Sequence, residues 1–275
     1  MLFVSFPQQK TVRLTAKAVT LCISTAVALC LGGCSSTRNG AAKNEAQTRY
    51  EIGLSFYTDG RFPESIEQLA RAYQLDGSRP EILMHLGLAH LRIEKYKEAE
   101  DYIRQACEQG KEFAECWNNL AFVRYKRKEY RAGMEAARKA LSYVTYTTPE
   151  LAHGNLALSA LELREYKQAH DSLQTALRLN PQFCQARVLV VKVFVRKGDF
   201  ERALSEAKQA TNICPEVEQA HLWQAFTYYK MGSHSSARIK CEQTLERFRK
   251  GVAVDTCRSW LEKMELRKAL DEPTL

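Results

Sequence analysis

The chain has 275 residues, of which 45% are hydrophobic and 26% are charged, a composition typical of a globular protein and unlike that of a disordered one. Only seven prolines and thirteen glycines interrupt it, which favours helices joined by short connections. Three charges of the net +8 lie in residues 1–17, and we expect the remaining +5 to be spread through the chain, where basic residues alternate with Glu at helical spacing, as at Lys95, Lys97 and Glu98. This pattern indicates solvated helix faces and argues against nucleic acid as a partner.

Residues 1–33 have the organisation of a secretory signal peptide. Residues 1–17 contain three basic residues and no acidic one, and residues 18–31 form an uncharged apolar run. This run is shorter than the roughly 20 apolar residues that a permanent transmembrane helix requires. A basic region followed by a short apolar region and small residues predicts a signal that is cleaved.

The end of the apolar run is more specific. Leu31-Gly32-Gly33-Cys34 resembles the lipobox of bacterial lipoproteins. The resemblance implies cleavage before Cys34, a diacylglycerol on its sulfur, and attachment to a membrane through this lipid anchor. An ordinary signal peptide and an uncleaved anchor are the alternatives. Ser35 follows the cysteine, where lipoproteins retained at the inner membrane tend to carry Asp, so the resemblance implies the outer membrane, facing the periplasm.

The segment after the lipobox differs in character from the rest of the chain. Residues 34–45 are mostly small and polar, and they show no periodic apolar residue. We expect them to form a flexible tether that spans about 15–20 Å between the lipid and the folded body.

From residue 46 onward, an apolar pattern recurs with a period of 34 residues. Small residues are common at the eighth, twentieth and twenty-seventh places of each period, and aromatic residues are common at the seventeenth. This is the period and pattern of the tetratricopeptide repeat (TPR), in which each unit is a pair of antiparallel helices. Six units fit, at residues 46–79, 80–113, 114–149, 150–183, 184–217 and 218–251.

One such helix pair cannot bury its apolar faces alone, so the units are expected to stack. The sequence therefore predicts an all-α fold, a TPR right-handed superhelical solenoid of six helix-turn-helix repeats. Residues 252–270 carry an apolar stripe opposite a polar side, and they predict a C-terminal capping helix followed by a tail at residues 271–275. A helix that docks onto a partner is the alternative for residues 252–270.

Nine cysteines are present, and three of them, Cys22, Cys30 and Cys34, belong to the signal and the lipobox. The other six are even in number, and an oxidising compartment favours disulfides. The repeat geometry brings them together as three pairs, which are Cys107 with Cys116, Cys184 with Cys214, and Cys241 with Cys257. The alternative is six buried free thiols, because free cysteine is often buried in protein cores.

No catalytic constellation stands out in the sequence. His85 and His90 do not share a helical face well, and His90 with Glu94 supplies too few ligands for a metal ion. The zinc-protease, nucleophile-elbow and phosphate-loop motifs are all missing from the sequence. We therefore expect no enzyme activity, no metal, no cofactor and no small-molecule substrate.

The first helices of the units are expected to line a concave groove that binds a protein partner. Their groove positions are mostly apolar or aromatic, and exposed apolar surface on a repeat array usually marks a partner site. The alternative is that these side chains pack against one another. The predicted contact residues are Tyr50, Leu54, Tyr57, Met84, Leu88, Leu91, Asn118, Phe122, Tyr125, Leu158 and Leu161.

A lipobox followed by six TPR units resembles the PilF/PilW/Tgl family of type IV pilus pilotins, over nearly the whole chain after the signal. The more specific part is the longer junction between units three and four, Tyr146-Thr147-Thr148-Pro149-Glu150, although this chain has Ala157 where the family usually has Gly. The resemblance implies an outer-membrane secretin as the protein partner, with an apolar segment held in the groove and delivered to the membrane for assembly. Another envelope TPR lipoprotein scaffold, acting in outer-membrane protein assembly or as an adaptor of peptidoglycan enzymes, is the alternative.

Overall fold

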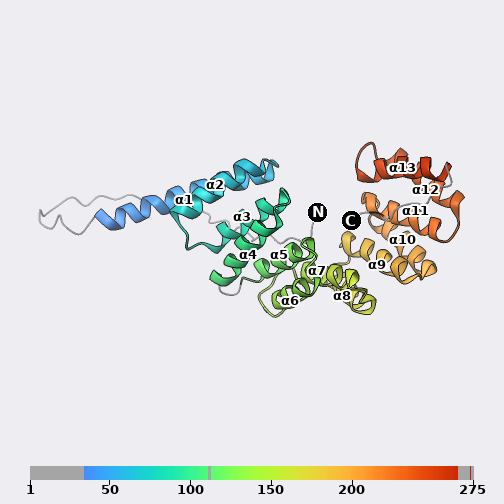
Figure 1. The fold of residues 1–275 in the computed structure, drawn as a ribbon, viewed down its shortest axis with the longest axis horizontal. Coiled ribbons are helices and arrows are strands. Elements are labelled where there is room, and N and C mark those ends of the chain that lie inside the picture. The colour runs from blue at the N-terminus through green and yellow to red at the C-terminus, as the bar shows by residue number, and fades with distance from the viewer. Residues whose placement is uncertain (1–33, 111–112, 266–272, 274–275) are drawn as a thin grey trace, which may run out of the picture. The chain divides into compact units, whose positions relative to one another are not determined.

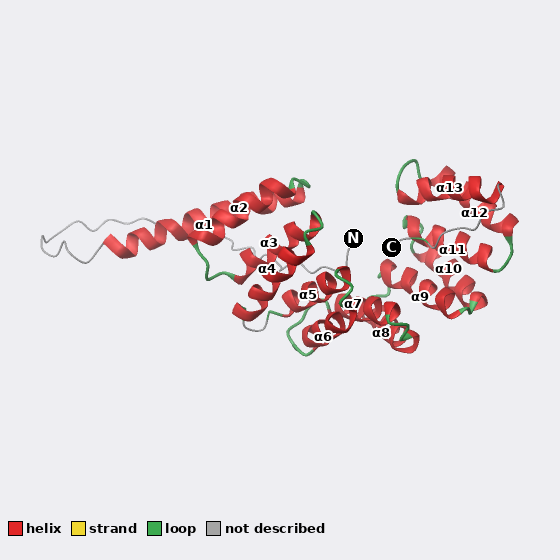
Figure 2. Cartoon of the chain, in the orientation of Figure 1, coloured by secondary structure: helices red, strands yellow, loops and turns green. Residues whose placement is uncertain are grey.

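The computed structural model describes residues 34–110, 113–265 and 273, and within them it has thirteen helices and no strand (Figures 1 and 2). The helices are α1 (Cys34–Thr58), α2 (Phe62–Leu75), α3 (Pro80–Arg92), α4 (Tyr96–Gln109), α5 (Ala114–Lys126), α6 (Tyr130–Leu141), α7 (Pro149–Glu162), α8 (Tyr166–Leu179), α9 (Cys184–Lys197), α10 (Phe200–Ile213), α11 (Glu218–Lys230), α12 (His234–Arg247) and α13 (Val252–Glu265). Each predicted repeat contains two of them in succession. The predicted signal at residues 1–33 lies outside the described residues.

The chain divides into two compact units, Met1–Arg127 and Lys128–Leu275. The described helices of the first unit are α1 to α5, and those of the second are α6 to α13. Within each unit, helices that follow one another in the chain pack together. First helices also contact the next first helix, as α3 contacts α5 and α9 contacts α11, so they form an inner layer.

Turn chemistry and small residues make each pair a hairpin. Gly60 and Gly198 have φ values of 78° and 83°, a left-handed backbone that glycine adopts without steric cost, and each ends a first helix. Gly87 of α3 faces α4 so closely that a Cβ there would lie 2.5 Å from Ile103 Cγ1 and 2.9 Å from the carbonyl oxygen of Ala99. A larger residue at position 87 would therefore push α3 away from α4.

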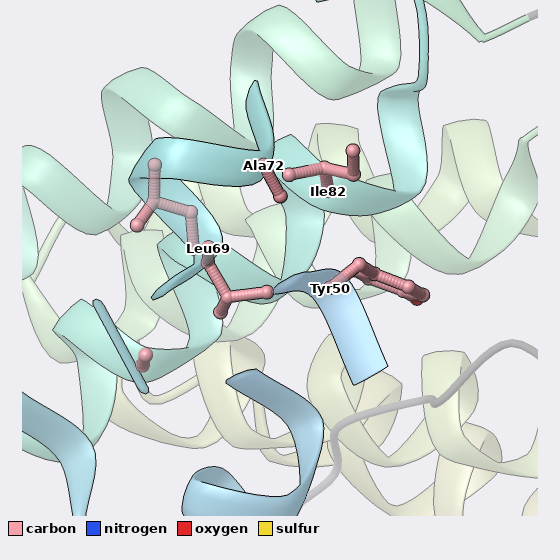
Figure 3. Close-up of a cluster of buried hydrophobic side chains, with 6 residues drawn as sticks. Tyr50, Leu69, Ala72 and Ile82 are labelled. Carbon is pink, nitrogen blue, oxygen red and sulfur yellow. The ribbon is translucent and has the colours of Figure 1, made fainter. Parts of the chain in front are cut away.

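The core of the first unit joins three helices. Tyr50 of α1, Leu69 and Ala72 of α2, and Ile82 of α3 are buried side by side (Figure 3). Leu86 and Ala89 of α3 complete this cluster. Because each large buried apolar side chain contributes about 1.5–3 kcal/mol, the cluster fixes how the first two hairpins stack.

The last helix closes the second unit. Phe226 of α11 lies between two buried tryptophans, with ring centroids 5.9 Å from Trp223 of the same helix and 5.7 Å from Trp260 of α13. At the start of α13, the backbone N–H of Ala253 donates to Oε2 of Glu218 at 3.0 Å. The helix α13 therefore covers the last hairpin, in the place that a capping helix takes.

The segment expected to be a flexible tether is helical in the structure. Residues 34–45 form the first turns of α1, which continues to Thr58. They include the strong helix formers Ala41 and Ala42, and Glu45 pairs with Arg49 one turn later at 2.9 Å. Our sequence argument relied on apolar periodicity, which a helix surrounded by water does not need to show.

None of the helices in the described part of the chain combines the length and the apolarity that crossing a bilayer requires. The longest of them, α1, has 25 residues, and its first half is small and polar. The apolar run at residues 18–31 lies outside the described residues.

Candidate protein-binding surface

The predicted groove residues lie on the first helices α1, α3, α5 and α7, and most of them are covered. Only Leu54, Tyr57 and Tyr125 are half-buried. The other eight are buried, and they are Tyr50, Met84, Leu88, Leu91, Asn118, Phe122, Leu158 and Leu161. The expected exposed apolar row is therefore wrong for most of its members, because neighbouring first helices pack against each other as well as against second helices.

Polar side chains within this inner layer are held by specific contacts. In α3, the ring nitrogen Nδ1 of His85 lies 2.9 Å from the carbonyl oxygen of Glu81 and 3.1 Å from the hydroxyl of Tyr50. Burial lowers the pKa of His85 to about 4 and raises the pKa of Tyr50 to about 12. Asn119 of α5 donates to Met84 Sδ at 3.4 Å. These contacts satisfy neutral buried groups, which is a structural role.

In the first unit, the accessible part of the predicted site lies at the C-terminal ends of the first helices. The guanidinium of Arg92 lies 6.0 Å from the ring centroid of Tyr57 and 4.8 Å from that of Phe62, the first residue of α2. Burial raises the pKa of Tyr57, although Arg92 lowers it in part. We name Tyr57, Phe62 and Arg92, with Tyr125 and Lys126, the aromatic–cation edge of the first unit.

The same edge continues at the end of α5. The rings of Phe122 and Tyr125 lie 6.2 Å apart, and Nζ of Lys126 lies 5.9 Å from the Phe122 centroid. Aromatic rings with one polar end and cations that keep water-facing donors are the residues that protein interfaces favour. Our sequence analysis did not select Arg92 or Phe62. A sequence pattern could have found them. Arg92 is a basic residue at the end of the first helix α3, and Phe62 is the aromatic residue that starts the second helix before it, α2.

Two carboxylates, the buried Glu100 and the half-buried Glu162, link neighbouring helices. In the first unit, Glu100 of α4 accepts from Arg124 of α5 at 3.0 Å and also pairs with Arg127. In the second unit, Glu162 of α7 pairs with Lys192 of α9 at 3.6 Å and with Arg196 at 3.0 Å. Each carboxylate thus meets two cations of the next first helix, which fixes the stacking of neighbouring hairpins.

Two of the three expected cysteine pairs are bonded. Cys107 of α4 is joined to Cys116 of α5 with a Cα–Cα distance of 5.5 Å. Cys184, which begins α9, is joined to Cys214, which follows α10, at the same end of one hairpin, with a Cα–Cα distance of 5.8 Å. Both pairings match the sequence prediction, since antiparallel helices bring these positions to the same end.

The third pair differs from the prediction. Cys241 of α12 and Cys257 of α13 face each other but are free, buried thiols. The hydrogen bond with Cys257, together with burial, raises the pKa of Cys241, and the same hydrogen bond lowers the pKa of Cys257. The sequence analysis correctly predicted that α12 and α13 lie together. The proximity of two thiols does not by itself determine whether they are oxidised to a disulfide.

Among the described residues, no group of three or more His, Cys, Asp and Glu side chains could hold a metal ion. The described acidic residues that are buried, such as Glu100, form ion pairs with arginines. Of the predicted contact residues, Leu54 and the aromatic–cation edge members Tyr57 and Tyr125 are the ones that keep exposed surface.

Comparison with known proteins agrees with this architecture. The family model of the tetratricopeptide repeat matches residues 50–114 and 155–218. The crystal structure of PilW, described as a widely conserved type IV pilus biogenesis factor, is similar with a TM-score of 0.69 and 18% identity, and the match covers 77% of this chain and 97% of PilW. PilF of Pseudomonas aeruginosa is similar with a TM-score of 0.65 and 15% identity, over 83% of this chain and 100% of PilF. At these identities the likeness concerns the fold.

The matching curated proteins are larger. Human protein O-mannosyl-transferase TMTC1 is 23% identical over 176 residues, which cover 63% of this chain and 20% of that protein. The bovine BBSome member BBS4 is 22% identical over 173 residues, which cover 63% of this chain and 32% of that protein. The chain therefore spans about a fifth to a third of the length of these relatives.

Proposed function

We propose that this chain, an all-α TPR solenoid, is a lipid-anchored scaffold of the outer membrane that binds a secretin and promotes its assembly for the type IV pilus. The observation that carries the proposal is the extent of the structural likeness. The matches cover 97% of PilW and 100% of PilF, so these two proteins align from end to end with this chain. The lipobox-like Leu31-Gly32-Gly33-Cys34 supports the membrane attachment.

The contact with the partner would use the aromatic–cation edge instead of a wide apolar groove. Tyr57 and Tyr125 are half-buried and Arg92 and Lys126 are exposed, so a partner segment could cover them without opening the core. Burial of such aromatic and cationic side chains supplies most of the energy in many protein interfaces. The acyl chains on Cys34 would hold the complex at the membrane in which the secretin barrel forms. Binding and delivery, with no chemical step, make up the proposed activity.

A second candidate is an envelope scaffold for outer-membrane protein assembly or for peptidoglycan enzymes. The TPR fold supports this role equally well, because the repeat itself does not select a partner. The extent of the match to PilW and PilF favours the secretin.

Deletion of the gene followed by an assay of heat-resistant secretin multimers tests the proposal. We expect multimers to disappear and to return when the wild-type chain is supplied. A Cys34→Ser variant should give secretin monomers away from the outer membrane, because the lipid anchor is lost. Multimers that persist without the chain would reject the secretin role.

A double variant, Tyr57→Ser with Tyr125→Ser, tests the aromatic–cation edge. We expect it to remain folded, because both side chains are only half-buried, and to lose capture of the secretin by about ten-fold or more. The matched control is Tyr228→Ser, which changes a half-buried tyrosine of α11 in the second unit. Equal capture by the double variant and the control would move the contact elsewhere.

A further inference from the structure

The net charge of the described part of the chain belongs to one of its two units. Residues 34–127 carry fourteen Lys or Arg and fourteen Asp or Glu, whereas residues 128–265 carry twenty-one and sixteen. Within the second unit, residues 128–197 alone carry eleven basic and six acidic residues. The positive charge therefore concentrates on α6 to α9.

Two turns in this region share one sequence pattern. Residues 128–131 are Lys-Glu-Tyr-Arg, and residues 164–167 are Arg-Glu-Tyr-Lys. All four basic side chains are exposed, and the side chain of Arg131 is 81% exposed. Nη1 of Arg131 lies 4.0 Å from Oε1 of Glu165, so the two turns are neighbours. We name residues 128–131 and 164–167 the cationic turns.

The backbone of both cationic turns is strained in the same way. Lys128 has φ 65° and Arg164 has φ 61°, in the left-handed region that side chains disfavour. The equivalent position in three other repeats is glycine, at Gly60, Gly198 and Gly232, with φ values of 78°, 83° and 77°. The remaining repeat has Glu94 there, with φ 60°, so long charged residues of either sign occupy a position where glycine would be more stable.

The helices that follow begin with a cation. Arg131 and Lys167 lie in the first turns of α6 and α8, and neither of these first turns contains an acidic residue. The helix dipole disfavours cations at this end, and the N-cap residues Glu129 and Glu165 offset part of this effect. Both turns therefore share a basic residue in the left-handed region and two exposed cations.

We infer that the cationic turns form a contact with the anionic headgroups of a lipid membrane. This inference rests on the proposed lipid anchoring, which would hold the chain at a bilayer surface. Lys and Arg near an anionic surface each strengthen association by roughly five-fold, and tyrosine is favoured at the membrane interface. Tyr130 and Tyr166 lie half-buried between the cations. An open depression of about 690 Å³ beside them is lined by the cations Arg164 and Lys167 and by the carboxylates Glu165 and Asp171, so a headgroup would meet the two cations at its rim.

A membrane fits the cationic turns better than a protein does. At the aromatic–cation edge, cations lie over aromatic rings, as Arg92 does over Phe62, and a protein interface buries such pairs. Among the described residues, none of the exposed large apolar side chains lies within the cationic turns. The turns present four exposed cations, the two carboxylates Glu129 and Glu165 and two half-buried tyrosines, and the excess of cations suits a flat anionic surface.

Lysine labelling on vesicles tests the inference. The acylated full chain is reconstituted on neutral phosphatidylcholine vesicles or on vesicles with about 30% phosphatidylglycerol, and a water-soluble acylating reagent is applied. We expect Lys128 and Lys167 to react about three-fold or more slowly on the anionic vesicles, and the difference to vanish in about 1 M NaCl. Lys95 and Lys97, at the corresponding turn of the first unit, should react equally on both.

A double variant distinguishes the effect of the charges from an effect on folding. Lys128→Gly with Arg164→Gly removes two cations and relieves two strained residues. We expect its melting temperature to stay the same or to rise by about 2–4 °C per site, while the retarded labelling of Lys167 on anionic vesicles is lost. The control Glu94→Gly relieves the same strain, at φ 60°, in the first unit and should leave the labelling of Lys167 unchanged.

The failure of this inference differs from the failure of the proposed function. Flotation with neutral vesicles reports the anchor, so protein that stays unbound there contradicts the lipid anchoring. Equal labelling rates of Lys128 on neutral and anionic vesicles overturn the membrane contact, with or without flotation. Slower labelling caused by the secretin alone, with no effect of anionic lipid, would assign the cationic turns to a protein and would also overturn it.

Discussion

The first helices of the hairpins and the second helices are covered in opposite ways. In α3, residues 82–91 are buried without interruption, and in α9 and α11 the same holds for residues 188–195 and 220–227. In α10, only Ala203, Ala207 and Ala210 are buried, one turn apart on a single face. The first helices α3, α9 and α11 therefore belong to an inner layer, whereas the second helix α10 keeps one wet face; α1, at the start of the array, also stays largely exposed.

This difference explains where the predicted binding row was wrong. The row was selected because its residues are apolar, but apolar residues on a helix that is surrounded by other helices are core residues. The half-buried Tyr57 and Tyr125 remain accessible because they lie near the ends of α1 and α5, where the inner layer meets solvent. Contact with a partner is thus expected at helix ends and turns.

The largest expected difference in unfolding free energy is between two Leu→Ala variants, one in each layer. Leu120→Ala in α5 removes a side chain with no exposure, and we expect it to cost about 2–5 kcal/mol of unfolding free energy. Leu179→Ala at the end of α8 changes a side chain that is 51% exposed, and it should cost less than about 0.5 kcal/mol. Urea unfolding followed by circular dichroism measures both. Similar losses would mean that the two layers do not differ in burial.

A pH experiment sharpens the comparison at His85, which is buried in the inner layer. Its pKa is lowered to about 4 from 6.5, so between these values the unfolded chain binds a proton that the folded chain does not. Stability is therefore complete above about pH 6.5 and falls by about 1.4 kcal/mol per pH unit as the pH drops towards about 4. We expect His85→Gln to flatten this part of the pH profile of the urea midpoint. An unchanged slope would show that His85 is accessible to protons in the folded state.

A pair of glycine substitutions gives the smallest effect. Gly87→Ala should destabilise the protein by about 1–3 kcal/mol, because the new Cβ would meet Ile103 Cγ1 at 2.5 Å. Gly40→Ala should stabilise it by up to about 1 kcal/mol, because Gly40 lies in α1 with nothing within 4 Å. Thermal unfolding of the two variants measures both shifts. Shifts in the same direction would contradict the close approach of α3 and α4.

The sequence predicted features that depend on neighbours along the chain. Five of the six second helices start with Phe or Tyr, as at Tyr96 and Phe200, and turn glycines such as Gly198 precede some of them. Both signals are local, and they locate the hairpins. The pairing of Cys184 with Cys214 followed from one hairpin alone. The tether was missed because α1 continues through a polar segment that carries no apolar signal.

What the sequence determined by itself is the identity of the elements: six helix pairs and a final helix, set by a pattern that repeats every 34 residues. Only the tertiary structure decided which apolar residues are core and which are surface, as with Phe122 and Tyr125 in the same helix. The physical reason is that these two kinds of interaction act over different distances along the chain. Turn and helix preferences act within a few residues, whereas burial depends on how closely separate hairpins approach one another, and packing across the whole stack sets that distance.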